Sequence, residues 1–193
     1  MRSHTFAVLD TETTGFSPVR GDKLVEVAVV KIREGEVQAS EYFSTLIDPE
    51  RSIPPAATRV HKIVNSDVQG KPKFCDVAAE LMEFMEDVDY LFIHNSKFDL
   101  NFLIAETEKN NITLRLPKII CSVALSKNLY PSYQSHNLNA IAKRLGLEIT
   151  DGELRHRALG DVIMTGEAVL KFHEENPITF LGTLEQLADT RFV

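Results

Sequence analysis

The first part of the chain alternates apolar and polar positions with the period of two that is typical of strands. Three consecutive strands are expected, at residues 5–11, 23–32 and 36–47. The second segment, KLVEVAVVKI, is dense in β-branched side chains and predicts a strand buried in a sheet. Glu34-Gly35 marks the tight turn between the second and third strands. The proline-rich residues 48–58 are expected to form a loop.

Apolar positions further along the chain follow helical spacing, interrupted by short apolar runs. Helices are expected at residues 74–85, 98–110, 136–145, 158–174 and 178–188, and short strands at residues 90–94 and 118–121. Ser135 is the expected N-cap of the helix that Gly146 closes. Three strands followed by alternating helices and strands predict an α/β fold, in which a mixed sheet is flanked by helices.

The composition is that of an ordinary globular domain, with 193 residues, 44% of them hydrophobic and 25% charged. No N-terminal signal pattern and no run of about 18 apolar residues appears, so no membrane segment is expected. The two cysteines, Cys75 and Cys121, favour buried free thiols in a reducing compartment over a disulfide framework. A cytoplasmic protein is therefore expected.

The net charge of −7 argues against a protein that coats long nucleic acid by neutralising its phosphates. It does not exclude an enzyme that grips the end of a strand. Carboxylates that hold divalent cations raise the acid count and yet present positive charge at their site.

Acidic side chains stand at the ends of apolar strands and in the first turns of helices. Asp10 and Glu12 lie two residues apart at the end of the first strand, so both point the same way and repel each other unless a cation lies between them. The alternative is that the strand frays and both are solvated. Asp99 falls in the first turn of a helix, where an acid is also common for dipole reasons alone.

The segment RHRALGD adds a histidine and an aspartate, His156 and Asp161. Five residues span about 500° of a helix, about 140° away from a shared face. The two side chains can converge only if the helix begins between them, with His156 on the preceding loop. Read alone, the segment also fits a solvated helix start.

Together, the four carboxylates predict a metal site at the edge of the sheet, where open α/β sheets bind ligands. Oxygen ligands suit Mg²⁺ or Mn²⁺, and two such ions can clamp the attacking and leaving oxygens of a phosphoryl transfer. His156 could take a proton from the attacking water.

Three motifs in this order, DTETTG, HNSKFDLNFL and HRALGD, resemble those of the DEDDh 3′–5′ exonucleases. That family includes the epsilon proofreading subunits of bacterial replicative polymerases and related free-standing exonucleases. The likeness runs from about Phe6 to Phe172. It implies a ribonuclease H-like exonuclease fold around a five-stranded mixed sheet, with the exonuclease domain at residues 1–175 and a short, helical C-terminal tail at residues 176–193.

The resemblance also implies roles for the site residues. Two Mg²⁺ or Mn²⁺ ions would be held by the four carboxylates, with Asp10 bridging them. Glu12 and Asp161 would hold the ion that activates water, and Asp99 would help to hold the second, partly through water. His156 would be the general base.

The same resemblance implies a cleft for the 3′ end of a single-stranded or frayed nucleic acid. The Thr13-Thr14 backbone would hold the terminal hydroxyl, and Phe16 would stack on the last bases. His61 would lie near the terminal nucleotide, and Asn95 would line the cleft. The alternatives are that Phe16 packs in the core and that His61 only caps a loop.

Three departures from the family pattern leave the carboxylates intact. Lys62 stands where a glycine is usual, which puts the geometry of its loop in doubt. Ile93 replaces a smaller residue, which we interpret as strand packing, and Cys121-Ser122 stands where a threonine is often found.

Other functions explain less of the sequence. A phosphatase of the haloacid dehalogenase type would use an acid two residues after Asp10, but an aspartate rather than Glu12, and it leaves the two later motifs unexplained. An exonuclease-like module that docks on a DNA polymerase subunit would not need the intact carboxylates. The tail segment LEQLADTRF fits a clamp-binding peptide poorly. Basic residues between 111 and 154 suggest a solvated face rather than a strand track, and the choice between DNA and RNA stays open.

Overall fold

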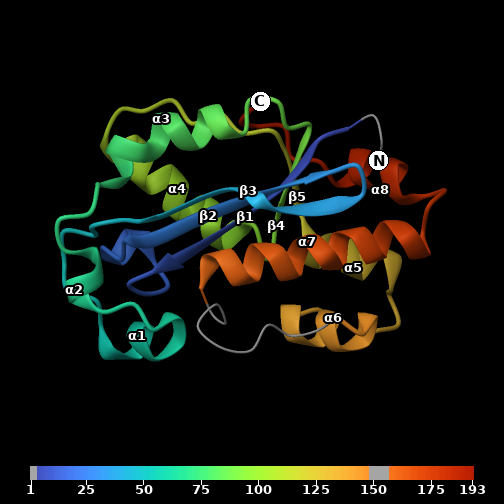
Figure 1. Ribbon diagram of the computed structural model, residues 1–193, viewed down its shortest axis with the longest axis horizontal. Coiled ribbons are helices and arrows are strands. Elements are labelled where there is room, and N and C mark those ends of the chain that lie inside the picture. Colours follow the sequence, from blue (N-terminus) through green and yellow to red (C-terminus); the bar gives the residue numbers. More distant parts are fainter. Residues whose placement is uncertain (1–3, 148–156) are drawn as a thin grey trace.

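The computed structural model describes residues 4–147 and 157–193 of the chain, and its centre is a five-stranded mixed sheet (Figure 1). The strands are β1 (Phe6–Thr13), β2 (Leu24–Arg33), β3 (Glu36–Leu46), β4 (Tyr90–Ile93) and β5 (Lys118–Cys121), in the order β3-β2-β1-β4-β5. The pairs β1–β2 and β2–β3 are antiparallel, whereas β1–β4 and β4–β5 are parallel. The predicted five-stranded mixed sheet is therefore confirmed.

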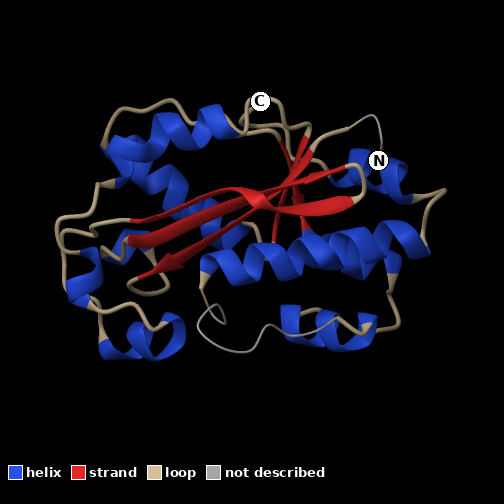
Figure 2. Cartoon of the chain, viewed as in Figure 1, coloured by secondary structure: helices blue, strands red, loops and turns tan. Residues whose placement is uncertain are grey.

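Helices cover both faces of this sheet (Figure 2). They are α1 (Pro55–His61), α2 (Asn65–Val68), α3 (Phe74–Phe84), α4 (Lys97–Lys109), α5 (Ser122–Leu129), α6 (Leu138–Leu145), α7 (Ala158–Glu175) and α8 (Phe180–Leu187), with a 3₁₀ turn η1 (Pro18–Arg20) after β1. Helices α3 and α4 pack on one face, and α5, α7 and α8 on the other.

The alternation in β1 explains why the sheet is covered twice. Ala7 and Leu9 pack in the core under α3 and α4, while Phe6 and Val8 pack in the core under α7. Because successive side chains point to opposite faces, one apolar strand serves both cores. Helix α7 lies very close to the sheet, since a β-carbon at Gly166 would come within 2.9 Å of a Val37 methyl group.

Three helices, α1, α2 and α5, appear where the sequence pattern did not indicate them, and α2 is a single turn of four residues. Helix α1 begins at Pro55, inside the segment predicted as a loop, because proline is tolerated in the first turn of a helix. Helix α5 (Ser122–Leu129) is short and buries Ser122 and Ser126 beside Leu125, so its apolar residues alone show no clear helical period. The N-cap of α6 is Asn137, whose side chain accepts a hydrogen bond from the Ala140 N–H at 2.8 Å, and the predicted N-cap Ser135 is wrong.

The C-terminal residues fold back onto the sheet. Phe180 and Leu184 of α8 are buried beside α5 and α7. Asp189 and Ile119 then exchange two backbone hydrogen bonds of 2.9 Å, and the Phe192 carbonyl accepts one from the Leu116 N–H. The LEQLADTRF segment is thus partly helical and packed on the edge of the sheet, which argues against an extended clamp-binding peptide.

The cysteines, Ile93 and the apolar character of the helices bear on three further predictions. Both cysteines are free thiols, as predicted, but each is half-buried rather than buried. Ile93 is fully buried in β4, which agrees with its interpretation as strand packing. Within the described residues, we find no helix that is long and apolar enough to cross a membrane.

Candidate active site

The parallel pairing of β1 and β4 brings two of the acidic motifs to one edge of the sheet. The last pair of residues is Leu9 and Ile93, so Asp10 extends past the end of β4. After Ile93 the chain turns and enters α4, whose first turn carries Asp99. Parallel strands end at the same edge, which is why residues so far apart in the sequence meet there.

Helix α7 supplies the third acidic motif. Asp161 lies in its first turn, and carboxylate oxygens of Asp10, Glu12 and Asp161 all lie within 4.8 Å of one another. We call these three residues the acidic cluster. The site pattern predicted that they would meet, and the structure brings them together.

Asp99 lies beside the acidic cluster but is held differently. One of its oxygens accepts hydrogen bonds from the Thr11 N–H at 3.1 Å and the Thr11 hydroxyl at 2.7 Å. Burial raises the pKa of Asp10 most, and among the neighbouring charges that of Asp99 raises it most. The expected role of Asp99 at a second ion stays a prediction.

Burial and mutual repulsion set the protonation of these groups. Burial raises the pKa of Asp10 well above its usual value, and the charges of Asp99, Glu12 and Asp161 raise it further. Burial, followed by the charge of Asp161, raises the pKa of Glu12 to about 9. Burial also raises the pKa of Asp99 to about 7, although its bonds to Thr11 oppose this. Without a cation, the site cannot hold all of its charges at neutral pH.

A divalent cation fits this set of donors. Three half-buried carboxylates converge on one place, and bringing a cation there would remove the repulsion that raises their pKa values. The donors are all oxygens, which Mg²⁺ and Mn²⁺ prefer. The cluster is therefore compatible with divalent metal binding, while the identity and number of the ions stay predictions.

The candidate base His156 lies outside the described residues. What the structure does describe is the start of α7 at Ala158, after Arg157 in an extended conformation with φ −117° and ψ 143°. The helix thus begins between positions 156 and 161, as the five-residue spacing requires. The role of His156 stays a prediction.

A further buried acidic residue near the site, Glu26 of β2, was not singled out from the sequence. It lies opposite Glu12 in the β1–β2 pair, and its side chain is only 3% exposed. Arg157 bonds to both of its oxygens, at 2.7 and 3.0 Å. The available signal was the one acidic residue inside the mostly apolar segment KLVEVAVVKI.

A cavity of about 420 Å³ opens next to the acidic cluster, between the loop after β1 and helix α1. Its lining includes Glu12, Thr13, Phe16 and His61. The Phe16 side chain is 89% exposed, which excludes the alternative that it packs in the core. An exposed aromatic ring at the mouth of a cavity is suited to stacking on a base.

The buried ring of His61 faces this cavity with one nitrogen unpaired. Its Nδ1 accepts a hydrogen bond from the Ile63 N–H at 3.1 Å, so the ring proton belongs on Nε2. Among the described residues, Nε2 makes no hydrogen bond of good geometry, although an interaction with the Thr13 backbone opposes the lowering of the His61 pKa. Burial lowers the pKa of His61, which keeps the ring neutral at pH 7. His61 does cap its loop, as the alternative proposed, but it also leaves a donor for a ligand.

Three other positions of the cleft can be placed. Thr14 is buried and uses its hydroxyl to accept a hydrogen bond from the Lys23 N–H, so it fixes the loop. Asn95 is exposed at φ 62°, its carbonyl accepts the Phe98 N–H, and it does not line the cavity. Lys62 adopts φ 64°, the left-handed conformation that favours glycine, so the loop keeps its shape with a lysine.

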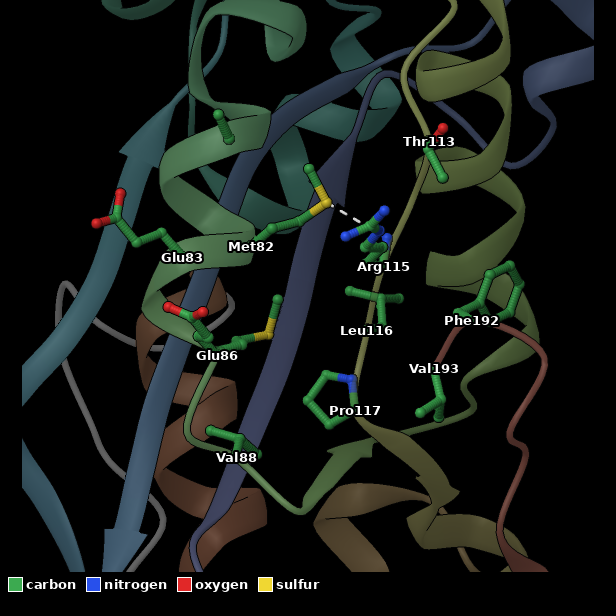
Figure 3. Close-up of a pocket in the computed structure, with 12 residues that line it drawn as sticks. Met82, Glu83, Glu86, Val88, Thr113, Arg115, Leu116, Pro117, Phe192 and Val193 are labelled. Atoms are coloured by element: carbon green, nitrogen blue, oxygen red, sulfur yellow. Dashed lines mark hydrogen bonds between the residues drawn. The ribbon is translucent and has the colours of Figure 1, made fainter.

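A second cavity, of about 580 Å³, lies on the α3 face of the sheet (Figure 3). It is bordered by α3, the segment before β5 and the C-terminal residues, and the Arg115 N–H lies 3.3 Å from the Met82 sulfur there. None of the predicted site residues lines it.

The suggested basic face is not continuous. Arg115 lines the cavity on the α3 face, whereas Arg144 belongs to α6, which packs on the opposite side of the sheet. Arg144 stacks on the Tyr133 ring at 3.5 Å, and Lys118 pairs with Glu185 at 3.1 Å. This distribution argues against a single track for a strand.

Comparisons with known proteins agree with this geometry. Residues 7–169 match the family model described as Exonuclease. A DNA polymerase III subunit epsilon-like protein of Rhodobacter capsulatus is 40% identical over 86% of this chain, which spans 23% of that relative. The DNA polymerase III subunit epsilon of Rickettsia conorii is 32% identical over 85% of this chain, which spans 71% of that protein.

Solved structures show the same fold. Exonuclease X in complex with 5′ overhanging duplex DNA has a TM-score of 0.75 and 26% identity, and the match covers 96% of this chain and 98% of that one. The nuclease domain of 3′hExo, a DEDDh family member bound to rAMP, has a TM-score of 0.77 and 16% identity over 90% of this chain and 93% of that one. The expected ribonuclease H-like exonuclease fold is confirmed.

Proposed function

Because the chain belongs to the exonuclease family, we propose that it is a metal-dependent 3′–5′ exonuclease that releases nucleoside 5′-monophosphates from DNA. The observation that carries the proposal is the acidic cluster of Asp10, Glu12 and Asp161 beside the cavity with Phe16 and His61. An enzyme of this kind needs a place for metal ions next to a place for one strand end, and these two features lie side by side.

In this proposal the carboxylates hold the metal ions and His156 transfers the proton. Bound Mg²⁺ or Mn²⁺ would activate a water and stabilise the charge on the leaving oxygen. Asp10, Glu12, Asp99 and Asp161 would hold the ions. His156 would take the proton of the water, because its ordinary pKa lies near neutral pH.

The cavity would hold the terminal nucleotide. The Thr13 backbone would contact the 3′ hydroxyl, and the unpaired Nε2 of His61 would donate to an oxygen of the sugar or phosphate. Phe16 would stack on a base without regard to its identity, as a nonspecific exonuclease requires.

DNA is favoured over RNA by the names of the relatives and by the DNA in the Exonuclease X structure. We infer further that the protein works with a DNA polymerase subunit, since both relatives described above are named for DNA polymerase III. The free cysteines support the cytoplasm as its proposed location.

A time course with labelled oligonucleotides tests the proposal. With Mg²⁺ or Mn²⁺, the protein should shorten single-stranded DNA and duplex DNA with a mismatched 3′ end from that end, and should act more slowly on short RNA. Asp161→Ala should abolish the reaction, and His156→Ala should slow it about 10²- to 10⁴-fold while metal binding persists. Intact DNA would refute the function, preferential loss of RNA would change the substrate, and a wild-type rate for His156→Ala would refute the assigned base.

A further inference from the structure

Glu26 is a buried carboxylate that the proposed mechanism does not use. It lies near the start of β2, directly opposite Glu12 in the sheet, and its side chain is 3% exposed. A charged group at such a position is costly unless it is paired and hydrogen-bonded. Its partners therefore indicate what it does.

Both oxygens of Glu26 bind the start of helix α7. Oε1 accepts from the Arg157 Nη2 at 2.7 Å, and Oε2 accepts from the Arg157 Nε at 3.0 Å. Oε2 also accepts from the backbone N–H of Ala158 at 3.1 Å. The two-pronged bond to a guanidinium fixes direction as well as distance. With these oxygens occupied, Glu26 is a poor ligand for an ion in the acidic cluster.

This contact replaces an ordinary helix cap. Arg157 is the N-cap residue of α7, and its own side chain makes no cap hydrogen bond. The first N–H groups of a helix lack partners within the helix, and a negative charge there is favourable. Glu26 provides an acceptor for the Ala158 N–H and a negative charge at this helix end, although it lies 131 residues before Arg157 in the chain.

The same contact leads directly to the acidic cluster. The carbonyl of Arg157 accepts the backbone N–H of Asp161 at 3.1 Å. The path from Glu26 to Asp161 thus consists of the bonds to Arg157 and one hydrogen bond of the helix. The middle of α7 is positioned separately, by the close approach of Gly166 to Val37.

We propose that Glu26 and Arg157 are positioning residues, which hold the first turn of α7 so that Asp161 faces Asp10 and Glu12. This inference rests on the proposed exonuclease function for its effect on rate. Its effect on the local structure and on metal affinity does not depend on that function.

The test uses the full chain with Glu26→Gln, Arg157→Gln and the double variant. The matched control is Lys31→Gln. Lys31 lies on the same strand, its side chain is 8% exposed, and it pairs with Asp87 at 2.8 Å. It contacts Phe84 at the α3 face, away from α7, so its loss destabilises the protein without touching the start of α7.

Three measurements are made on each variant: amide hydrogen exchange in residues 157–165, Mn²⁺ affinity, and kcat and KM on single-stranded DNA. Both single variants should speed exchange in this segment and weaken Mn²⁺ binding about 10-fold, as expected when a partner that orients a metal ligand is lost. They should lower kcat about 10-fold with little change in KM. Because the two residues act through one contact, the double variant should lose no more Mn²⁺ affinity or kcat than the more strongly impaired single variant. Lys31→Gln should lower the melting temperature and leave all three measurements unchanged.

Normal Mn²⁺ affinity and kcat in Glu26→Gln, with only a lower melting temperature, would overturn the inference. If Glu26→Gln does not fold, Arg157→Gln is the variant that tests the inference. The Arg157 side chain is 30% exposed, so its replacement disturbs the core less than that of the buried Glu26. If the wild-type protein degrades no nucleic acid, the proposed function fails, while exchange and Mn²⁺ affinity still decide the positioning role.

Discussion

The Asp99 carboxylate is bound twice by Thr11, through the backbone N–H and through a hydroxyl 2.7 Å from Oδ1. Thr11 lies between Asp10 and Glu12 on β1 and points to the other face of the sheet. The strand that presents two carboxylates therefore also orients a third. Both hydrogen bonds lower the pKa of Asp99, against the effect of burial.

Thr11→Val should shift the pH dependence of Mn²⁺ binding by the metal-free protein to higher pH. It keeps the shape of the side chain but removes the hydroxyl donor, so the pKa of Asp99 should rise from about 7 and Asp99 should be ionised less at neutral pH. Loss of one hydrogen bond to a charged group should raise the pKa of that group by about 1–2 units. Profiles of Mn²⁺ affinity against pH measure the shift. Thr11→Ser, which keeps the hydroxyl, is the control, and an unshifted profile for Thr11→Val would contradict the role.

The metal-free protein should lose stability as the pH rises. The pKa of Glu12 is raised from 4.5 to about 9 by burial and by Asp161, so the folded state binds the proton more tightly than the unfolded state. The stability from this proton is complete below about pH 4.5 and is lost as the pH rises toward about 9. Asp99 adds to the loss near pH 7.

Thermal melting with EDTA and with Mg²⁺ across this range checks the prediction. The ion replaces the protons as the source of stability, so the gain in melting temperature on adding Mg²⁺ should grow with pH. Glu12→Gln should flatten the metal-free curve because it removes the titrating group. An equal gain from Mg²⁺ at all pH values would show that these carboxylates do not bind it.

Phe16→Ala should weaken substrate binding with little effect on stability. The ring is 89% exposed at the cavity, so its removal leaves no hole in the core. Loss of one base stack of about 1–3 kcal/mol should raise KM roughly 5- to 150-fold. The control is Val19→Ala, since Val19 is 97% exposed in the nearby η1 turn and does not line the cavity. Equal KM values for the two variants would argue against stacking.

Lys62→Gly should stabilise the protein. Lys62 has φ 64°, which costs a residue with a β-carbon about 1–2 kcal/mol. Glycine removes this strain and costs about 0.5–1 kcal/mol in chain entropy, so a net gain of about 0.5–1 kcal/mol is expected in urea unfolding. Lys62→Ala removes the same side chain but keeps the strain, and it should not stabilise. An equal gain in the free energy of unfolding in both variants would show that the loss of the lysine side chain, and not the relief of backbone strain, stabilises the protein.

The sequence by itself determined the strands, most of the helices and the acidic motifs. Local periodicity suffices for β1 and α7, because the side chains that define them are neighbours in the chain. The position of Asp161 five residues after His156 already required a helix start between them, and α7 begins at Ala158. The sequence pattern did not reveal α5, whose short segment lacks a clear period, and it placed the cap of α6 at the wrong residue.

Only the tertiary structure decided how the site is supported. Glu26 meets Arg157 across 131 residues, and Thr11 meets Asp99 across 88, so neither pair leaves a trace in any local window. Which nitrogen of His61 is unpaired depends on the turn of the loop at Ile63, and Asn95 turned out not to line the cavity. A motif names the groups that can do chemistry, but their orientation comes from contacts that exist only once the sheet has brought distant segments together.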